Sequence, residues 1–149
     1  KLSRMTLTDV IMQEPNVQTL QRWLKKVPYA VFLDIRADIR NGEIVFILPE
    51  NKKLIGNPSL PALHGGVVGA FLEQAGAFHL IAKMNKPALP KIIDFSLDYL
   101  RPARLQDTYA QCTLTRGRAI ANISIKAWQE DFEKPNAIAR AHFLLPETD

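Results

Sequence analysis

The residues best suited to chemistry surround the start of one strongly apolar segment. Gly65 and Gly66 open a stretch from Val67 to Met84 in which apolar residues occur at almost every angle of a helical wheel. A helix N-terminus presents unpaired backbone N–H groups and the positive end of the helix dipole. Because glycine has no side chain, a carbonyl oxygen could approach these amides and be polarised by them. A tight turn into the helix is the alternative reason for the glycine pair.

Glu73 is the one carboxylate within this apolar segment. A charged side chain among apolar neighbours costs free energy unless it is paired, so its presence requires a reason. A carboxylate in such a place can act as a nucleophile or as a general base. A buried ion pair and a hydrogen bond across a subunit interface are the structural alternatives.

The spacing between the glycines and Glu73 limits how they can act together. Seven residues separate Gly66 from Glu73, which is about 700° of helical rotation and about 10 Å along the axis. Both groups therefore lie near one helical face, but one carbonyl carbon cannot be within hydrogen-bonding reach of both. Two antiparallel copies related by a two-fold axis would place Glu73 of one chain beside Gly66 of the other. The sequence predicts a dimer with composite sites.

Other polar residues near this segment are candidates of lower rank. His64 precedes the glycine pair and could either donate to a carbonyl or hold the loop in place. Asn57 and Gln74 could contact water or an acyl carbonyl, and could equally be ordinary satisfied polar residues. We expect no metal site, because His64, His79 and His142 lie far apart in sequence and fit no ligand motif.

The elements that position these residues follow from periodicity. Asn16 is expected to cap an amphipathic helix that Pro28 ends. Alternating apolar residues on both sides of Asn41-Gly42 predict a hairpin with a type I′ turn. A loop over 49–63 leads to the apolar helix, and four strand-like segments follow it, at 93–99, 108–116, 118–128 and 137–145.

This order of elements predicts an α+β fold. Successive late strands joined by short turns form an antiparallel sheet that can curl around one central helix, which differs from a doubly wound arrangement. The chain of 149 residues has the length of one domain, and no repeat or linker divides it. We therefore expect a single domain over 1–149.

Composition narrows the classes of function. The apolar fraction of 47% and the charged fraction of 23% are ordinary for a globular protein, and no apolar stretch reaches the roughly 20 residues of a membrane span. The net charge of +4 suits an anionic ligand but is too dispersed to indicate nucleic-acid binding. Residues 1–8 carry no apolar signal core and Cys112 is the one cysteine, so we expect a reducing, cytoplasmic location.

Three blocks of sequence resemble one known family. The blocks are Pro61-Ala-Leu-His64-Gly65-Gly66 with Glu73 nine residues after the histidine, Asp98-Tyr-Leu-Arg-Pro102-Ala103, and Thr115-Arg116-Gly117-Arg118. In this order they resemble the hotdog-fold acyl-CoA thioesterases of the PaaI-like (4-hydroxybenzoyl-CoA thioesterase) superfamily, from about residue 28 to residue 146. The resemblance implies a hotdog fold, in which an antiparallel sheet curls around a long central helix, here with an N-terminal helical segment. It also implies a homodimer or a dimer of dimers.

The resemblance implies hydrolysis of an acyl-CoA thioester. Glu73 would be the nucleophile or general base, and the amides of Gly65 and Gly66 would polarise the carbonyl, with His64 and Asn57 beside them. Coenzyme A is part of the substrate, so no separate cofactor is expected. Arginine suits phosphate groups, and the candidates for binding coenzyme A are Arg116 and Arg118 beside Gly117, which we favour, and then Arg101, Arg104 and Gln74.

The chain departs from the family pattern in three places, and two other functions stay open. Most members carry aspartate at Glu73, Asn57 is seven rather than six residues before the histidine, and Ile92 replaces a water-holding serine or threonine of some members. A hotdog dehydratase or hydratase acting on acyl-CoA or acyl-carrier protein is one alternative, because such enzymes carry a glutamate in the central helix. A non-catalytic acyl-CoA-binding module is the other. The His-Gly-Gly spacing favours hydrolysis.

Overall fold

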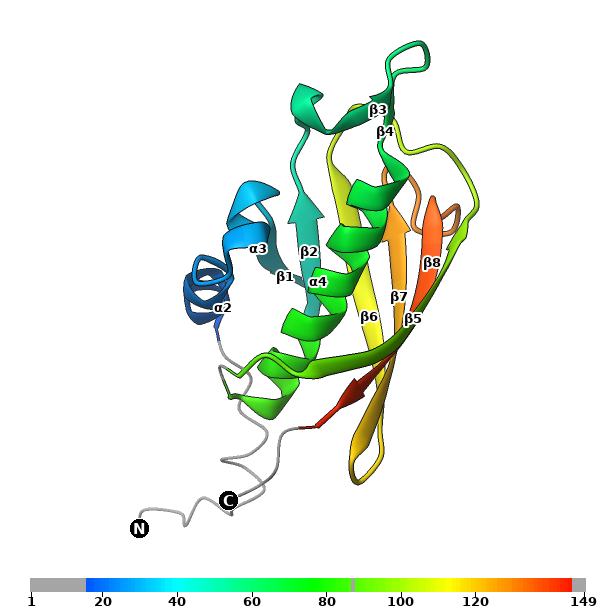
Figure 1. Cartoon of the computed structure of the whole chain (residues 1–149). Helices are drawn as coiled ribbons and strands as arrows, with labels where there is room; N and C mark the ends of the chain where they lie inside the picture. The colour runs from blue at the N-terminus through cyan, green and yellow to red at the C-terminus, as the bar shows by residue number, and fades with distance from the viewer. Residues whose placement is uncertain (1–15, 87, 146–149) are drawn as a thin grey trace.

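The computed structural model describes residues 16–86 and 88–145 (Figure 1). Its helices are α2 (Val17–Leu24), α3 (Pro28–Phe32) and the long α4 (Gly65–Met84), with a short 3-10 turn at Lys52–Leu54. Its strands are β1 (Arg36–Arg40), β2 (Glu43–Leu48), β3 (Ile55–Asn57), β4 (Ala62–Leu63), β5 (Lys91–Tyr99), β6 (Thr108–Arg116), β7 (Ile120–Trp128) and β8 (Ala137–Leu144). Residues 1–8, where we expect no export signal, lie outside the described residues.

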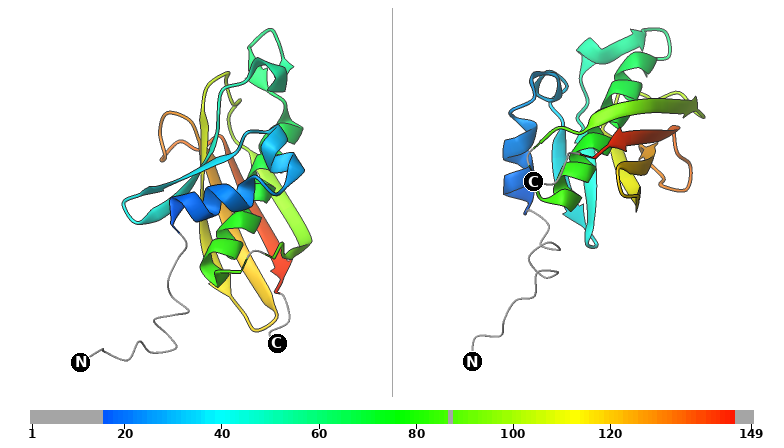
Figure 2. Two further views of the ribbon diagram at one scale, coloured as in Figure 1. Left: turned by 90° about the vertical axis from the view of Figure 1, so that its left-hand side faces the viewer. Right: turned by 60° about the horizontal axis from the view of Figure 1, so that its bottom comes forward.

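Six of these strands form one antiparallel sheet that curls around α4. The strand order is β1-β2-β6-β7-β8-β5, and each neighbouring pair is antiparallel. Figures 1 and 2 show α4 crossing the concave face, with α2 and α3 beside it near β1. β3 and β4 form a separate two-stranded ribbon where α4 begins. The predicted α+β fold, with an antiparallel sheet around a central helix, is confirmed.

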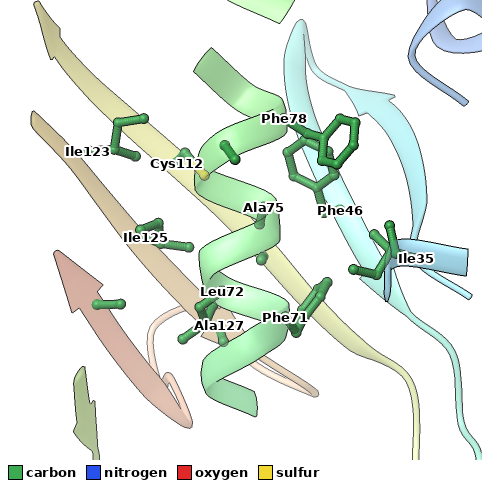
Figure 3. Close-up of a cluster of buried hydrophobic side chains, with 14 of the residues drawn as sticks. Ile35, Phe46, Phe71, Leu72, Ala75, Phe78, Cys112, Ile123, Ile125 and Ala127 are labelled. Carbon is green, nitrogen blue, oxygen red and sulfur yellow. The ribbon is translucent and has the colours of Figure 1, made fainter. Parts of the chain in front are cut away.

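The core lies between α4 and the sheet. Phe71, Leu72 and Ala75 of α4 are fully buried. Figure 3 shows Leu72 on the side of Ile125 and Phe71 on the side of Phe46. A Cβ atom at position 76 would lie 3.3 Å from the Ile125 Cδ1 atom, so glycine there lets the helix approach the sheet closely. Residues 75–82 of α4 are all buried, whereas the first turns of the helix and its last two residues are only partly buried. The helix that looks apolar all round in sequence is therefore partly uncovered in a single chain.

Two local differences from the sequence expectations have clear physical causes. Pro28 was expected only to end a helix, but it also begins α3, because proline's fixed φ suits the first helical position. The preceding residue, Val27, is extended at φ −103° and ψ 111° and separates the two helices. The expected loop over 49–63 contains β3 and β4, which pair through Ile55 and Leu63.

The hairpin turn is confirmed by backbone geometry. Asn41 has φ 53° and Gly42 has φ 78°, the left-handed values that a type I′ turn requires at both central positions. β1 and β2 pair on either side of this turn, from Arg40–Glu43 outward. The hairpin occupies one edge of the sheet, beside α2.

β5 forms the opposite edge and is exposed along most of its length. The side chains of Asp94, Ser96 and Asp98 face solvent, and Ile93 is 51% exposed. A nine-residue edge strand offers a row of unpaired backbone groups to another strand. Among the described residues, no helix is long and apolar enough to cross a membrane.

Candidate active site

His64 caps the start of α4. Its backbone is extended, at φ −61° and ψ 132°, and its ring Nδ1 atom accepts a hydrogen bond from the Gly66 N–H at 2.9 Å. The His64 carbonyl oxygen accepts from Val67 N–H at 3.0 Å and from Val68 N–H at 3.2 Å. Three of the first four amides of the helix are therefore satisfied by one residue.

The donors left free at this helix start belong to Gly65 and to His64. The Gly65 N–H has no acceptor among the described residues. Since Nδ1 of His64 accepts a hydrogen bond, the neutral imidazole carries its proton on Nε2, which becomes a second donor. The Gly66 N–H, which was expected to polarise a carbonyl together with the Gly65 N–H, is bonded to His64 in this structure. Gly65 offers the free amide.

Neighbouring elements hold this helix start in place. The Tyr99 hydroxyl, at the end of β5, donates to the Gly65 carbonyl oxygen at 2.7 Å, and His64 N–H donates to the Leu54 carbonyl oxygen at 2.9 Å. A Cβ atom at position 56 would lie 2.7 Å from the His64 Cα atom, so only glycine allows β3 to pack there. Sequence reasoning missed Tyr99, whose position within Asp98-Tyr-Leu-Arg-Pro102 is the signal that could have found it.

Glu73 lies two turns along the same helix. Its side chain is half-buried, and no hydrogen bond or ion pair joins its carboxylate to the described residues. Gly66, Ala70 and Ala77 share its helical face, and their small side chains leave room for a second chain to approach. α4 is unbroken, so the Gly65 amide and Glu73 are about 12 Å apart along the axis. One chain therefore does not bring the two groups together.

The two amide candidates have different surroundings. The Asn57 carboxamide oxygen accepts from the Ser59 N–H at 3.0 Å within the exposed β3–β4 turn. This local hydrogen bond agrees with the alternative that Asn57 is an ordinary polar residue whose hydrogen bonds are satisfied. Gln74 lies beside Glu73 on α4, and its Oε1 atom is buried without a hydrogen-bond partner among the described residues.

Arg101 and Arg104 lie in the connection between β5 and β6, next to the start of α4. Arg101 contributes to a cavity of about 270 Å³ that Gly65 also lines, together with Leu63, Val68, Tyr99, Leu100, Pro102, Ala103 and Asn136. A second cavity of about 220 Å³ shares Arg101, Pro102 and Asn136 with the first and adds Arg104, Gln106, Gln129, Glu130, Asp131 and Lys134. The two cavities are neighbours that share these three lining residues, and together they are here called the Arg101 groove. Gly65 lines the first cavity, and the cations Arg101, Arg104 and Lys134 line the second.

Arg116, Gly117 and Arg118 lie elsewhere in the chain. They form the turn between β6 and β7, which Figure 1 shows at the end of the sheet opposite to the start of α4. Both arginines are exposed. The structure therefore brings Arg101 and Arg104, but not Arg116 and Arg118, to the helix start within one chain.

The three histidines occupy separate places. His64 caps α4, His79 is buried in the same helix, and His142 on β8 pairs with Asp94 on β5 at 2.7 Å between Nδ1 and Oδ1. In residues 16–86 and 88–145, no group of three or more histidine, cysteine or acidic side chains is arranged to hold a metal ion.

Comparisons with known proteins place this geometry in a family. Residues 60–135 match the thioesterase superfamily. A crystal structure of a Chromobacterium violaceum protein is 40% identical, covers 89% of this chain and 93% of that chain, and has a TM-score of 0.71. A Haemophilus influenzae thioesterase is 21% identical over 89% of this chain and 91% of its own, with a TM-score of 0.75, and supports the hotdog fold alone.

One curated relative matches over part of its length. A Halobacterium salinarum protein, provisionally named an esterase, is 30% identical over 82 residues, which is 53% of this chain. The match covers 54% of that relative, so the chain spans about half of the protein it resembles. The family match covers the start of α4, Glu73 and the residues that line the Arg101 groove except Asn136. On these grounds the chain belongs to the thioesterase superfamily.

Proposed function

We propose that the chain hydrolyses acyl-CoA thioesters to a free acid and coenzyme A, at sites shared between the two chains of a homodimer. The observation that carries this proposal is the free Gly65 N–H at the start of α4, with the capping residue His64 as a second donor through its Nε2–H. These donors suit an oxygen atom that gains negative charge. The unpaired carboxylate of Glu73, on the same helix, supplies the other half of the chemistry.

The proposed reaction adds water across the C–S bond of the thioester. The carbonyl oxygen accepts hydrogen bonds from Gly65 N–H and His64 Nε2–H, which stabilise the tetrahedral intermediate. Glu73 takes a proton from the attacking water, the C–S bond breaks, and the proton passes to the departing thiolate. Alternatively, Glu73 attacks the carbonyl carbon itself, the C–S bond breaks to release the thiolate, and water then hydrolyses the resulting mixed anhydride, which regenerates the Glu73 carboxylate and supplies the proton that the thiolate takes up. Both routes need the same groups in the same places.

The dimer follows from the edge strand and from the separation on α4. Antiparallel pairing of two β5 strands would remove the exposed edge and join the two sheets. It would also place two α4 helices side by side in opposite directions. Glu73 of one chain would then lie beside Gly65 of the other, which closes the gap of about 12 Å. A dimer of dimers would keep the same two sites in each pair.

The Arg101 groove is the proposed site for the coenzyme A part of the substrate. Its end near Gly65 suits the pantetheine arm, and its far end suits phosphate groups. Arg101 uses one N–H on the Pro135 carbonyl oxygen at 3.1 Å, and Arg104 uses one on the Leu60 carbonyl oxygen at 3.0 Å. The remaining N–H groups of both guanidinium groups stay available for phosphate. Lys134 adds a third cation, and the acids Glu130 and Asp131 line the same cavity.

Arginine substitutions test this assignment. Arg101→Ala and Arg104→Ala should each raise the KM for acyl-CoA by about tenfold to a hundredfold, because a charged phosphate contact is lost. The KM for N-acetylcysteamine thioesters, which lack the nucleotide, should stay unchanged. Arg118→Ala, with or without a change at Arg116, is the matched comparison. A KM that rises for Arg118→Ala and not for the groove variants would move the phosphates to the β6–β7 turn.

A thiol-release assay tests the function itself. The purified protein is incubated with short, medium, long and aromatic acyl-CoA esters, and free coenzyme A is measured. We expect turnover on at least one class. A 2-enoyl-CoA substrate distinguishes the dehydratase alternative, which would add water across the C=C bond and release no thiol. Binding without either reaction would support the non-catalytic module.

Cys112 should not interfere with this assay. It is fully buried in β6, and burial raises the pKa of its thiol far above the ordinary value, which suppresses the reactive thiolate. We expect the folded protein to react with a thiol reagent only after denaturation, when one thiol per chain appears. Rapid labelling of the native protein would contradict this burial. A single reduced cysteine also suits the cytoplasm, where we propose that the protein acts.

A further inference from the structure

The connection between β5 and β6, residues 100–107, carries both arginines of the groove but contains no helix or strand. Its position depends on side chains from the other side of the groove. Gln129, which follows β7, is 9% exposed and lines the groove beside Arg104. It is one of four buried polar or charged residues in the described part of the chain.

Every hydrogen bond of the Gln129 amide goes to the connection or to its junction with β6. The Oε1 atom accepts from Arg104 N–H at 2.9 Å and from Gln106 Nε2 at 3.2 Å. The Nε2 atom donates to the Arg104 carbonyl oxygen at 2.9 Å and to Thr108 Oγ1 at 3.1 Å. Because a backbone N–H can only donate and a carbonyl can only accept, these partners fix the orientation of the amide.

The Gln129 side chain therefore bonds both backbone groups of Arg104, whose carbonyl oxygen also accepts from the Gln106 N–H at 2.9 Å. The guanidinium group of Arg104 donates to the Leu60 carbonyl oxygen, so the residue is fixed at its backbone and at its tip. An arginine held in this way loses less conformational freedom when it binds an anion. The Asn136 side chain also bonds the backbone of the connection, because its Nδ2 atom donates to the Pro102 carbonyl oxygen at 3.1 Å.

We propose that Gln129 is a positioning residue for coenzyme A binding, which acts by holding Arg104 against the phosphate groups of the substrate. The inference rests on the proposed function and on the Arg101 groove. The start of α4 has its own bonds to Tyr99 and Leu54, and the Leu63 N–H just before it donates to the Ala103 carbonyl oxygen at 2.8 Å, a bond that does not involve Gln129. Loss of the Gln129 bonds should therefore weaken nucleotide binding and leave the chemical step intact.

The test uses the full chain with Gln129→Met, which keeps the length of the side chain but removes all four hydrogen bonds. Gln129→Ala is the second variant, in case Met packs badly. We expect the KM for acyl-CoA to rise by about tenfold, with kcat unchanged, because a fixed cation has become mobile. The kcat/KM for N-acetylcysteamine thioesters should not change. Binding of 3′,5′-ADP, measured by calorimetry, should weaken by the same factor.

A double-mutant cycle separates positioning from general destabilisation. When Arg104→Ala is already present, Gln129→Met should cause no further rise in KM, because the residue it positions is gone. Ile125→Val is the control, since Ile125 is buried on β7, the strand that precedes Gln129, and its truncation lowers stability without touching the groove. It should leave both classes of thioester unaffected.

The outcomes distinguish this inference from the proposed function. If the wild-type protein binds 3′,5′-ADP and hydrolyses acyl-CoA, but Gln129→Met leaves the KM unchanged, the inference is wrong and the function stands. Equal losses on both classes of thioester, or additive effects in the cycle, would also overturn it. If the wild-type protein neither releases thiol nor binds coenzyme A, the proposed function itself has failed.

Discussion

Glu73→Gln is expected to lower kcat on acyl-CoA by about two to four orders of magnitude, the usual loss for a general base or nucleophile. The amide keeps the shape of the side chain but can neither take the proton from water nor attack a carbonyl. Because no described residue bonds to the Glu73 carboxylate, the substitution leaves no partner unpaired, and the melting temperature should change little. Steady-state kinetics measures the loss of kcat, and thermal unfolding measures the melting temperature.

The matched control for this variant is Glu43→Gln. Glu43 is an exposed carboxylate at the start of β2, distant in sequence from the helix start. It should keep wild-type kinetics, since only a charge on the surface is lost. Turnover of Glu73→Gln within about threefold of wild type would remove Glu73 from the chemistry. Glu73 would then have the structural role of forming a hydrogen bond across the subunit interface, an alternative that the sequence already raised.

Gly65→Pro should lower kcat by about a hundredfold to a thousandfold, the effect of deleting one donor to a developing oxyanion. Proline has no N–H, and it is tolerated at the first position of a helix. The preceding residue, His64, already has the extended backbone that proline requires, at φ −61° and ψ 132°. The variant therefore removes the proposed donor while the helix can still form.

Gly65→Ala is the control, because it adds a side chain and keeps the N–H. Its Cβ atom would lie 3.2 Å from the Tyr99 hydroxyl oxygen, so a shift of a few tenths of an ångström accommodates it. We expect Gly65→Ala to keep most of the activity that Gly65→Pro loses. Equal losses in the two variants would show that crowding, and not the missing donor, is responsible.

Periodicity was sufficient to predict the central helix and the six strands of the main sheet. The apolar segment after Gly66 became α4, and the alternating segments became β5 to β8 with boundaries within a few residues. The type I′ turn at Asn41-Gly42 was predictable because few residues adopt positive φ at both positions. Local signals of this kind depend only on neighbours in the sequence. β3 and β4 were missed because each is short and pairs within an irregular loop.

The candidate site was predictable only in part. The distance between Gly66 and Glu73 follows from helix geometry alone, which is why a composite site could be predicted without a structure. That His64 occupies the Gly66 amide depends on a side-chain rotamer, for which the sequence carries no periodic signal. The preference for Arg116 and Arg118 stays a prediction, and within one chain the β6–β7 turn lies at the end of the sheet opposite to the start of α4.

Gln129 shows a further limit of sequence reasoning. It reads as an ordinary polar residue at the end of a strand, because Arg104, whose backbone it holds, is 25 residues away. Nothing in its own neighbourhood distinguishes it from Gln111 or Gln106. Contacts between distant segments decide its burial and its hydrogen bonds, and these exist only after the sheet has formed.

The central claim is that each site combines Glu73 of one chain with the Gly65 amide of its partner, and subunit complementation tests it most directly. Purified Glu73→Gln and Gly65→Pro proteins are mixed in equal amounts, and subunit exchange is verified by mass spectrometry of the intact dimers. A mixed dimer holds one undamaged site of two. With random exchange we therefore expect recovery to about a quarter of wild-type activity, where each variant alone has almost none. No recovery after verified exchange would contradict the claim and place both groups of each site in one chain.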